Sequence, residues 1–206
     1  CFPLRNGGWI YAANSEVNGT GGGAAAIVFS ASGEITDAYR ILGETKWNCS
    51  GGATPWGTWL SGEEFRQGYV WECDPTKPGQ GVARQLLGRY AHEAAVVDPA
   101  TGWVYLTEDA GKGRLYRFRS DEYGDLSSGV LEAAKVNRAG NKVSWVEVSS
   151  KQPERSSSTT AFAPIRTRSP IVTFPRIFAP VPMFTWSPTV GPQSSKCFCE
   201  LLPMPR

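Results

Sequence analysis

The sequence lacks three patterns that would place it in common functional classes. It has no apolar stretch of about 18 residues or more, the length that a transmembrane helix needs. The formal net charge is only +2 over 206 residues, and no basic stripe of the kind that binds nucleic acid is present. No apolar stripe recurs at helical spacing over the length of a helix. We therefore expect neither a membrane nor a nucleic acid as a partner.

Residues for nucleophilic catalysis are also scarce. The chain contains a single His, His92, no Gly-x-Ser-x-Gly elbow and no convincing Ser-His-Asp set. Its five Cys are an odd number, so a complete disulfide framework is excluded and at least one thiol is free or bound to something. The chain opens at Cys1 without an initiator Met or a basic-then-apolar leader, which favours a truncated reading frame over a processed terminus.

Glycine and tryptophan are abundant instead. The chain has 23 Gly and eight Trp. Aromatic side chains fit the pleated surface of a sheet, and Gly supplies the backbone of tight turns. With no helical periodicity to oppose it, this composition predicts an all-β protein of short strands.

Composition changes at about residue 150. Residues 1–150 hold 22 of the 23 Gly and 17 of the 19 acids, whereas residues 151–206 hold ten of the 15 Pro. Because Pro removes a ladder donor, the second segment cannot be a run of central strands. A disordered Pro-rich extension and a frameshifted end are both open interpretations. We assign residues 1–150 to one domain and residues 151–206 to an irregular Pro- and Ser-rich tail.

A unit of Gly, an aromatic strand and an acidic end occurs three times in the first domain. The units begin at Gly8, Gly57 and Gly102, and each is followed by a Gly-containing loop and a second strand. This spacing suits a β-propeller blade, in which four short strands occupy roughly 40–50 residues. We predict a partial β-propeller of about three blades. With unpaired edges and an uncovered face, it is expected to be marginally stable by itself.

The acidic ends of the units form the first candidate site. If the units are blades, Glu16, the pair Glu63 and Glu64, and the pair Glu108 and Asp109 converge at one end of the channel. Crowded carboxylates repel one another, and a multivalent cation relieves the repulsion. Oxygen ligation favours hard cations such as Ca²⁺ or Fe³⁺. Single acids at strand ends are usually solvated turn residues, but the shared register favours a metal site.

Two further candidates lie between these ends. His92 and Glu93 either form a structural pair or send one side chain to the channel, because neighbours along a strand face opposite ways. Of the two, Glu93 fits a hard-metal pocket. Cys49 is either a buried core thiol or a thiolate ligand to iron, a role for which Ca²⁺ would not select it.

The stretch around Cys49 resembles the signature of the PhoX alkaline phosphatase family. Residues 48–60 read Asn-Cys-Ser-Gly-Gly-Ala-Thr-Pro-Trp-Gly-Thr-Trp-Leu, and a Glu-Glu pair follows at residues 63–64. Residues 88–94 and 104–109 match the next two motifs of that family in order and spacing. The resemblance covers roughly residues 8–120. One departure is Gly62, which stands where the family often has Cys.

The resemblance implies a six-bladed propeller that hydrolyses phosphate monoesters with a cluster of ferric and calcium ions and a bridging oxo group. It implies that Cys49 ligates iron. The metal ligands expected on this basis are Glu16, Cys49, Glu64, Glu93, Glu108 and Asp109. Small-molecule phosphoesters are the expected partners, and the intact protein is expected to be a monomer in the periplasm or outside the cell.

The resemblance does not extend to the second half of the ring, so we expect this chain by itself to be weakly active or inactive. The main alternative is a non-catalytic calcium-binding propeller whose top face binds a partner. A second alternative keeps an enzyme but changes its substrate to a phosphodiester or a lactone. Metal content separates the first two, because iron that is lost on Cys49→Ala favours the phosphatase and calcium alone favours the binding module.

Overall fold

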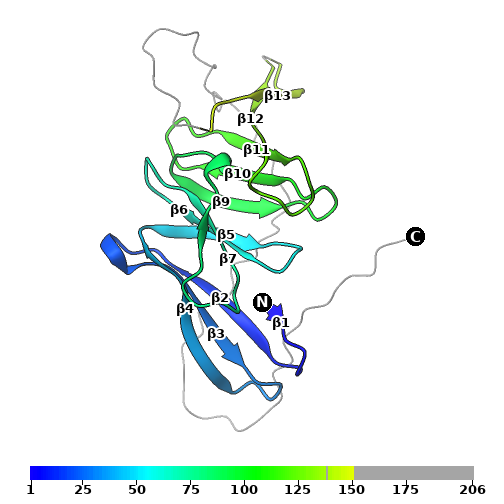
Figure 1. The fold of residues 1–206 in the computed structure, drawn as a ribbon. Helices are drawn as coiled ribbons and strands as arrows, with labels where there is room; N and C mark the ends of the chain where they lie inside the picture. The colour runs from blue at the N-terminus through cyan, green and yellow to red at the C-terminus, as the bar shows by residue number, and fades with distance from the viewer. Residues whose placement is uncertain (138, 151–206) are drawn as a thin grey trace, which may run out of the picture. The chain divides into compact units, whose positions relative to one another are not determined.

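A computed structural model describes residues 1–137 and 139–150 of the chain. The described residues all belong to one unit of the chain. The predicted tail at residues 151–206 lies outside the described residues. Within the described part, antiparallel strands form three separate sheets (Figure 1).

Each sheet consists of strands that follow one another directly in the chain. The first sheet has the order β1(Phe2–Pro3), β2(Trp9–Ser15), β3(Gly22–Phe29) and β4(Ile35–Thr45). The second sheet has the order β5(Asn48–Ala53), β6(Trp59–Glu63), β7(Val70–Cys73) and β8(Val82–Ala83). The third sheet has the order β9(His92–Val97), β10(Val104–Glu108), β11(Leu115–Ser120), β12(Gly129–Val136) and β13(Val143–Glu147). Two short 3₁₀ helices, η1(Gly19–Gly21) and η2(Gln85–Leu87), interrupt the connections.

The prediction of an all-β fold is confirmed, and the three predicted units correspond to the three sheets. The strands that open the units are β2, β6 and β10, each the second strand of its sheet. Strand β5 was not predicted, because its Gly51 and Gly52 give it the composition of a loop. The number of blades in a complete ring stays a prediction.

Two apolar cores hold the second sheet between the other two. The first core joins residues of the first sheet, such as Ile10 and Ile41, to Cys73 and the half-buried Trp59 of the second. The second core joins Leu60 and other residues of the second sheet to the third sheet. Burial of apolar surface contributes roughly 25 cal/mol per Å², so these two cores keep neighbouring sheets in contact along one face of each.

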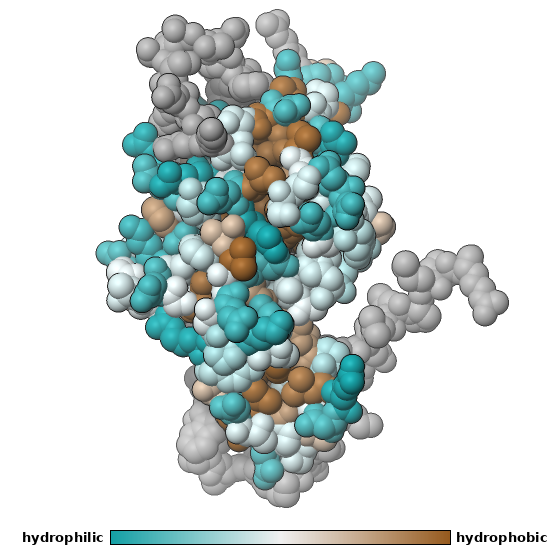
Figure 2. All heavy atoms as spheres, viewed as in Figure 1, coloured by the Kyte–Doolittle hydropathy of each residue, from teal (hydrophilic) through white to brown (hydrophobic). Residues whose placement is uncertain are grey.

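The opposite faces of the first and third sheets carry exposed apolar side chains. Tyr11 lies between the buried Ile10 and Ala12 and is 49% exposed, and Val96 lies between buried residues of β9 and is 61% exposed. On the face in Figure 2, apolar patches lie among predominantly polar residues.

No helix among the described residues is both long enough and apolar enough to cross a membrane.

Candidate metal centre

Five of the six predicted ligands lie at equivalent positions of the three sheets. Glu16, Glu64 and Asp109 each come directly after the second strand of their sheet, after β2, β6 and β10 respectively. Cys49 and Glu93 are each the second residue of the first strand of their sheet, in β5 and β9. Acidic and thiol side chains that are far apart in sequence are therefore placed by one repeated backbone pattern.

In both β5 and β9, the predicted metal ligand, or donor, lies at a β-bulge. Between Asn48 and Gly51, β5 advances by three residues while β6 advances by two. Around Glu93, β9 advances by two residues while β10 advances by one. A bulge leaves its extra residue outside the ladder and re-aims the side chain. Cys49 and Glu93 thus lie where each strand departs from regular pairing.

The same backbone hydrogen bond fixes the residues that follow β6 and β10. The amide of Glu64 donates to the carbonyl oxygen of Trp47 at 2.7 Å, and the amide of Asp109 donates to that of Ala91 at 3.0 Å. In both cases the accepting residue lies two positions before the predicted metal ligand at the bulge, Cys49 or Glu93. These bonds hold Glu64 beside Cys49 and Asp109 beside Glu93.

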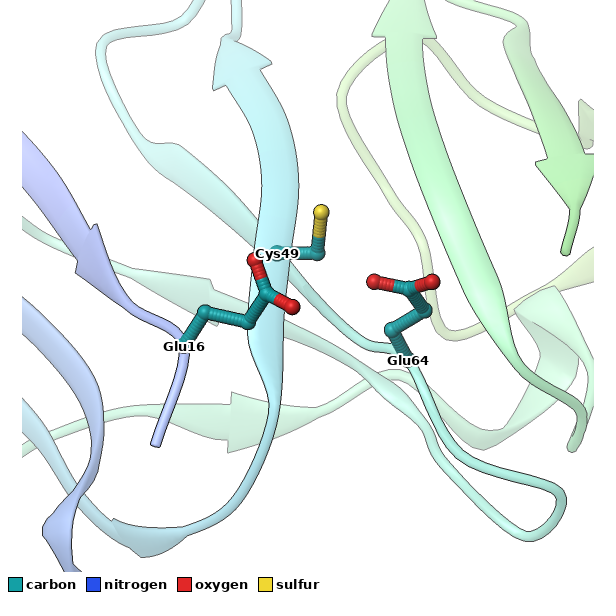
Figure 3. A group of neighbouring side chains, drawn as sticks. All are labelled: Glu16, Cys49 and Glu64. Atoms are coloured by element: carbon teal, nitrogen blue, oxygen red, sulfur yellow. The ribbon is translucent and has the colours of Figure 1, made fainter. Parts of the chain in front are cut away.

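The donors form two groups that share one residue. In the first donor group, single ligand atoms of Glu16, Cys49 and Glu64 all lie within 4.8 Å of one another. In the second donor group, the same holds for Glu64, Glu93 and Asp109. Figure 3 shows the first donor group, whose three side chains approach one another from separate segments of the chain. Glu64 joins the two groups into one five-residue centre.

Crowding of acidic groups perturbs the centre. The pKa of the Cys49 thiol is raised to about 12, chiefly by burial and then by its hydrogen bond with Glu64 and the nearby charges of Glu64, Glu16 and Glu93. Burial is also the main reason why the pKa of Glu64 is raised, and Asp109 and Glu93 act in the same direction. A cation among these side chains would favour their charged forms, so the donor set fits metal binding.

The two groups differ in the chemistry of their donors. The first combines a sulfur atom with two carboxylates, a set suited to a transition metal, because hard cations such as Ca²⁺ do not select thiolates. The second contains three carboxylates, which suit a hard cation. Cys49 and Glu64 are half-buried, whereas Glu16, Glu93 and Asp109 are exposed. The centre is therefore open to solvent on its carboxylate side.

Glu108 lies apart from both donor groups. Its Oε2 accepts a hydrogen bond from the Tyr116 hydroxyl at 3.2 Å and lies 3.8 Å from Arg114 Nη1. Its counterpart Glu63 is buried and accepts hydrogen bonds from two backbone amides, at 3.1 and 3.3 Å. In the predicted Glu-Glu and Glu-Asp pairs, the first acid therefore stabilises its own sheet and the second enters a donor group.

His92 also lies outside the centre. Its ring is fully buried, lies 3.9 Å from the Tyr90 ring between centroids, and places Nε2 3.3 Å from the Gly88 carbonyl oxygen. Burial lowers the pKa of His92 to about 4, so it is neutral at pH 7. Gly62 packs against it, because a Cβ at Gly62 would lie 3.0 Å from the His92 Cβ. At this position, Gly allows β6 to approach β9 closely.

Two residues beside the centre were not predicted. Asn14 hydrogen bonds to the carbonyl oxygen of Cys49, and Trp47 adopts a positive φ of 53°. The sequence contains no clear signal for either role. An Asn near a strand end has many possible partners, and a non-Gly residue in left-handed backbone is not marked by its neighbours.

A sequence profile described as "Alkaline phosphatase PhoX" matches residues 6–68 and 65–170 of the chain. The chain belongs to the PhoX alkaline phosphatase family. The predicted resemblance is thereby confirmed. No curated protein sequence matches this PhoX chain.

Among solved structures, this PhoX chain is similar to Pseudomonas fluorescens PhoX in complex with vanadate, a transition state analogue. The TM-score is 0.59 and the identity is 18%. The likeness covers 72% of this chain and 47% of the other, so this chain spans about half the length of the solved protein. At this level of identity the likeness shows the fold, and it agrees with the predicted propeller-like arrangement of sheets.

Proposed function

We propose that this chain carries the centre of a metal-dependent phosphomonoesterase of the alkaline phosphatase type. The observation that supports it best is the position of Glu64, whose carboxylate belongs to both donor groups. A shared carboxylate is suited to hold two cations close together. In this proposal the first donor group holds Fe³⁺ through Cys49, and the second holds Ca²⁺.

The cations, when bound, would neutralise the charge of a phosphate ester and stabilise the charge that develops as its P–O bond breaks. The side chains of the chain have three tasks. Cys49 would hold the iron as a thiolate, with its thiol proton lost to solvent, because the thiolate is the ligand form. Glu64 sets the spacing between the two groups. The exposed Glu16, Glu93 and Asp109 leave the centre open to a small phosphoester from the solvent side.

We also propose the setting in which this centre acts. Family membership supports small-molecule phosphoesters as substrates and a location in the periplasm or outside the cell. The intact protein is proposed to be a monomer. Because this chain spans 47% of the length of the solved PhoX chain, the 206-residue polypeptide alone is proposed to be weakly active or inactive.

Metal content is the most direct test. The purified chain is incubated with Fe³⁺ and Ca²⁺, freed of loosely bound ions, and analysed for both elements. We expect bound iron that is lost in Cys49→Ala and retained in the matched control Cys73→Ala, since Cys73 is a buried free thiol of β7 outside both donor groups. Calcium without iron would instead favour a non-catalytic calcium-binding propeller.

Hydrolysis assays test the reaction. Nitrophenyl phosphate, its bis-ester and a simple lactone are compared, each with and without the two cations. We expect slow, metal-dependent cleavage of the monoester that vanadate inhibits. Preference for the bis-ester or the lactone would contradict the proposed substrate class, and activity equal to that of an intact family member would contradict the proposed weakness of this chain.

A further inference from the structure

One side chain outside the donor groups connects the strands that carry the first of them. Asn14 is the last residue but one of β2 and lies half-buried two residues before Glu16. Its Nδ2 donates to the carbonyl oxygen of Cys49 at 3.2 Å, and its Oδ1 accepts from Trp59 Nε1 at 2.8 Å. A single carboxamide therefore joins the first sheet to both β5 and β6 of the second.

The bond to Cys49 meets a need that the bulge in β5 creates. Cys49 lies between Asn48 and Gly51, where the ladder between β5 and β6 is irregular, and a bulged residue is left without regular pairing. A polar backbone group that is left without a partner inside a protein destabilises the fold. Asn14 supplies a partner from another sheet. The backbone of Cys49, and with it the direction of its thiol, is thereby tied to β2.

Trp59 determines which way the carboxamide faces. The indole N–H is a donor only, so the Asn14 oxygen lies toward Trp59 and its NH₂ group lies toward Cys49. The indole is itself held by packing against the core of the first sheet, where its ring meets Phe2 edge to face at 6.5 Å between centroids. The orientation of the amide thus depends on a ring that has little freedom to move.

The geometry points to Asn14 as a positioning residue for the first donor group, an inference that rests on the proposed metal binding there. Asn14 does not enter the group. It holds Cys49 of β5 at a constant spacing from Glu16, which follows two residues later on the strand of Asn14 itself. Ligands already held at their binding spacing need less ordering when the cation arrives. Partners that orient ligands in this way typically contribute about 10–100-fold to metal affinity.

The test uses Co²⁺ as a probe of the sulfur ligand in the full 206-residue chain. The thiolate-to-cobalt charge-transfer absorption is followed during titration, and its loss in Cys49→Ser assigns it to Cys49. We expect Asn14→Ala to weaken Co²⁺ binding by about 10–100-fold. Asn14→Asp should weaken it at least as much, because a carboxylate oxygen would then face the Cys49 carbonyl oxygen. Trp59→Phe should act in the same direction with a smaller effect.

The matched control is Asn6→Ala. Asn6 lies before the other end of β2, and its side chain accepts a hydrogen bond from the Gly8 amide at 3.1 Å. This variant loses a local side-chain hydrogen bond in the turn before β2 and should bind Co²⁺ as the wild type does. Calorimetric titration with Ca²⁺ provides an internal control, because Glu93 and Asp109 have their own anchors in the third sheet.

Three results would overturn the inference, and they are distinguishable. Wild-type Co²⁺ affinity in a folded Asn14→Ala protein, or in Trp59→Phe if Asn14→Ala does not fold, refutes the positioning role alone. An equal loss of Co²⁺ and Ca²⁺ affinity indicates general loosening and refutes a selective role. Absence of any Cys49-dependent absorption in the wild type refutes the proposed sulfur-containing metal site, and the positioning role with it.

Discussion

The second and third sheets build the centre on similar strand pairings but with different side chains. Asn48 pairs with Glu63 at the start of β5, and His92 pairs with Glu108 at the start of β9. A bulge follows in both strands and carries the donor. The aligned residues are Trp47, Asn48, Cys49 and Glu64 in the second sheet and Ala91, His92, Glu93 and Asp109 in the third.

Asn48 and His92, which precede the donors Cys49 and Glu93, are both buried polar side chains but differ in their hydrogen bonding. Asn48 is fully buried, and its amide is satisfied by Thr45 Oγ1 at 2.7 Å and Ser61 Oγ at 3.0 Å. His92 is equally buried, but its Nδ1 has no hydrogen-bond partner within the described residues. The comparison teaches that the fold fixes where a donor lies, while the residue at that position sets its chemistry.

The largest effect on the centre is expected at Glu64, the residue that the two donor groups share. We expect Glu64→Gln to weaken both Co²⁺ and Ca²⁺ binding by at least about 100-fold, since it removes the charge and one oxygen of a direct ligand rather than changing an orienting partner. Asp109→Asn, its counterpart in the third sheet, should weaken Ca²⁺ alone. Titrations of both variants check this, and loss of a single metal in Glu64→Gln would contradict a shared carboxylate.

Replacing His92 by the Asn of the second sheet should change how stability depends on pH. The pKa of His92 falls from 6.5 in the unfolded chain to about 4 in the folded one, so the unfolded state binds more protons between these values. The contribution of neutral His92 to the free energy of unfolding is therefore fully present above pH 6.5. About 3 kcal/mol of this free energy is lost as the pH falls toward 4.

Urea unfolding at several pH values measures this effect in the wild type and in His92→Asn. The carboxylates titrate in both proteins, so the difference between the two pH profiles isolates the histidine. Parallel profiles from pH 7 to 4 would show that burial does not keep His92 neutral.

The next largest effect is expected from the backbone conformation of Trp47, which differs from that of its counterpart in the third sheet. Trp47 has a φ of 53°, and its amide donates to the Val17 carbonyl oxygen at 2.9 Å, whereas its counterpart Ala91 has no positive φ. Left-handed backbone costs a non-Gly residue roughly 1–2 kcal/mol.

Trp47→Gly should therefore be more stable than Trp47→Val by about 1–2 kcal/mol in urea unfolding. Both variants lose the indole, so their difference reports the backbone. Ala91→Gly and Ala91→Val supply the comparison in the third sheet, where no advantage for Gly is expected. Equal stability of the two Trp47 variants would mean that the conformation is not retained in solution.

The smallest expected effect is a change of metal preference. Cys49→Asp gives the second sheet a carboxylate like that of the third and makes the first donor group all-oxygen. Co²⁺ affinity should fall and Ca²⁺ binding at this group should rise, each by about tenfold or about 1.4 kcal/mol. Cys49→Ser should lose Co²⁺ affinity without the gain in Ca²⁺, and an identical response of both variants would show that the sulfur does not set the preference.

Much of the fold follows from local patterns that a sequence displays. The strands β2, β6 and β10 were predicted because aromatic residues recur after Gly and before an acid. Strand β5 was missed because its pairing with β6 joins residues six to 15 positions apart in the chain and does not depend on its own Gly-rich composition. Its bulge, which places Cys49, has no local signature.

The sequence by itself determined the three-unit repeat, the family and the acids that gather at the ends of the units. Tertiary structure alone decided that Asp109 joins the centre while Glu108 contacts Tyr116, and that Asn14 reaches Cys49. Alternation along a strand is a property of adjacent residues. Which face meets a neighbouring sheet depends on register and on hydrogen bonds between residues far apart in the chain.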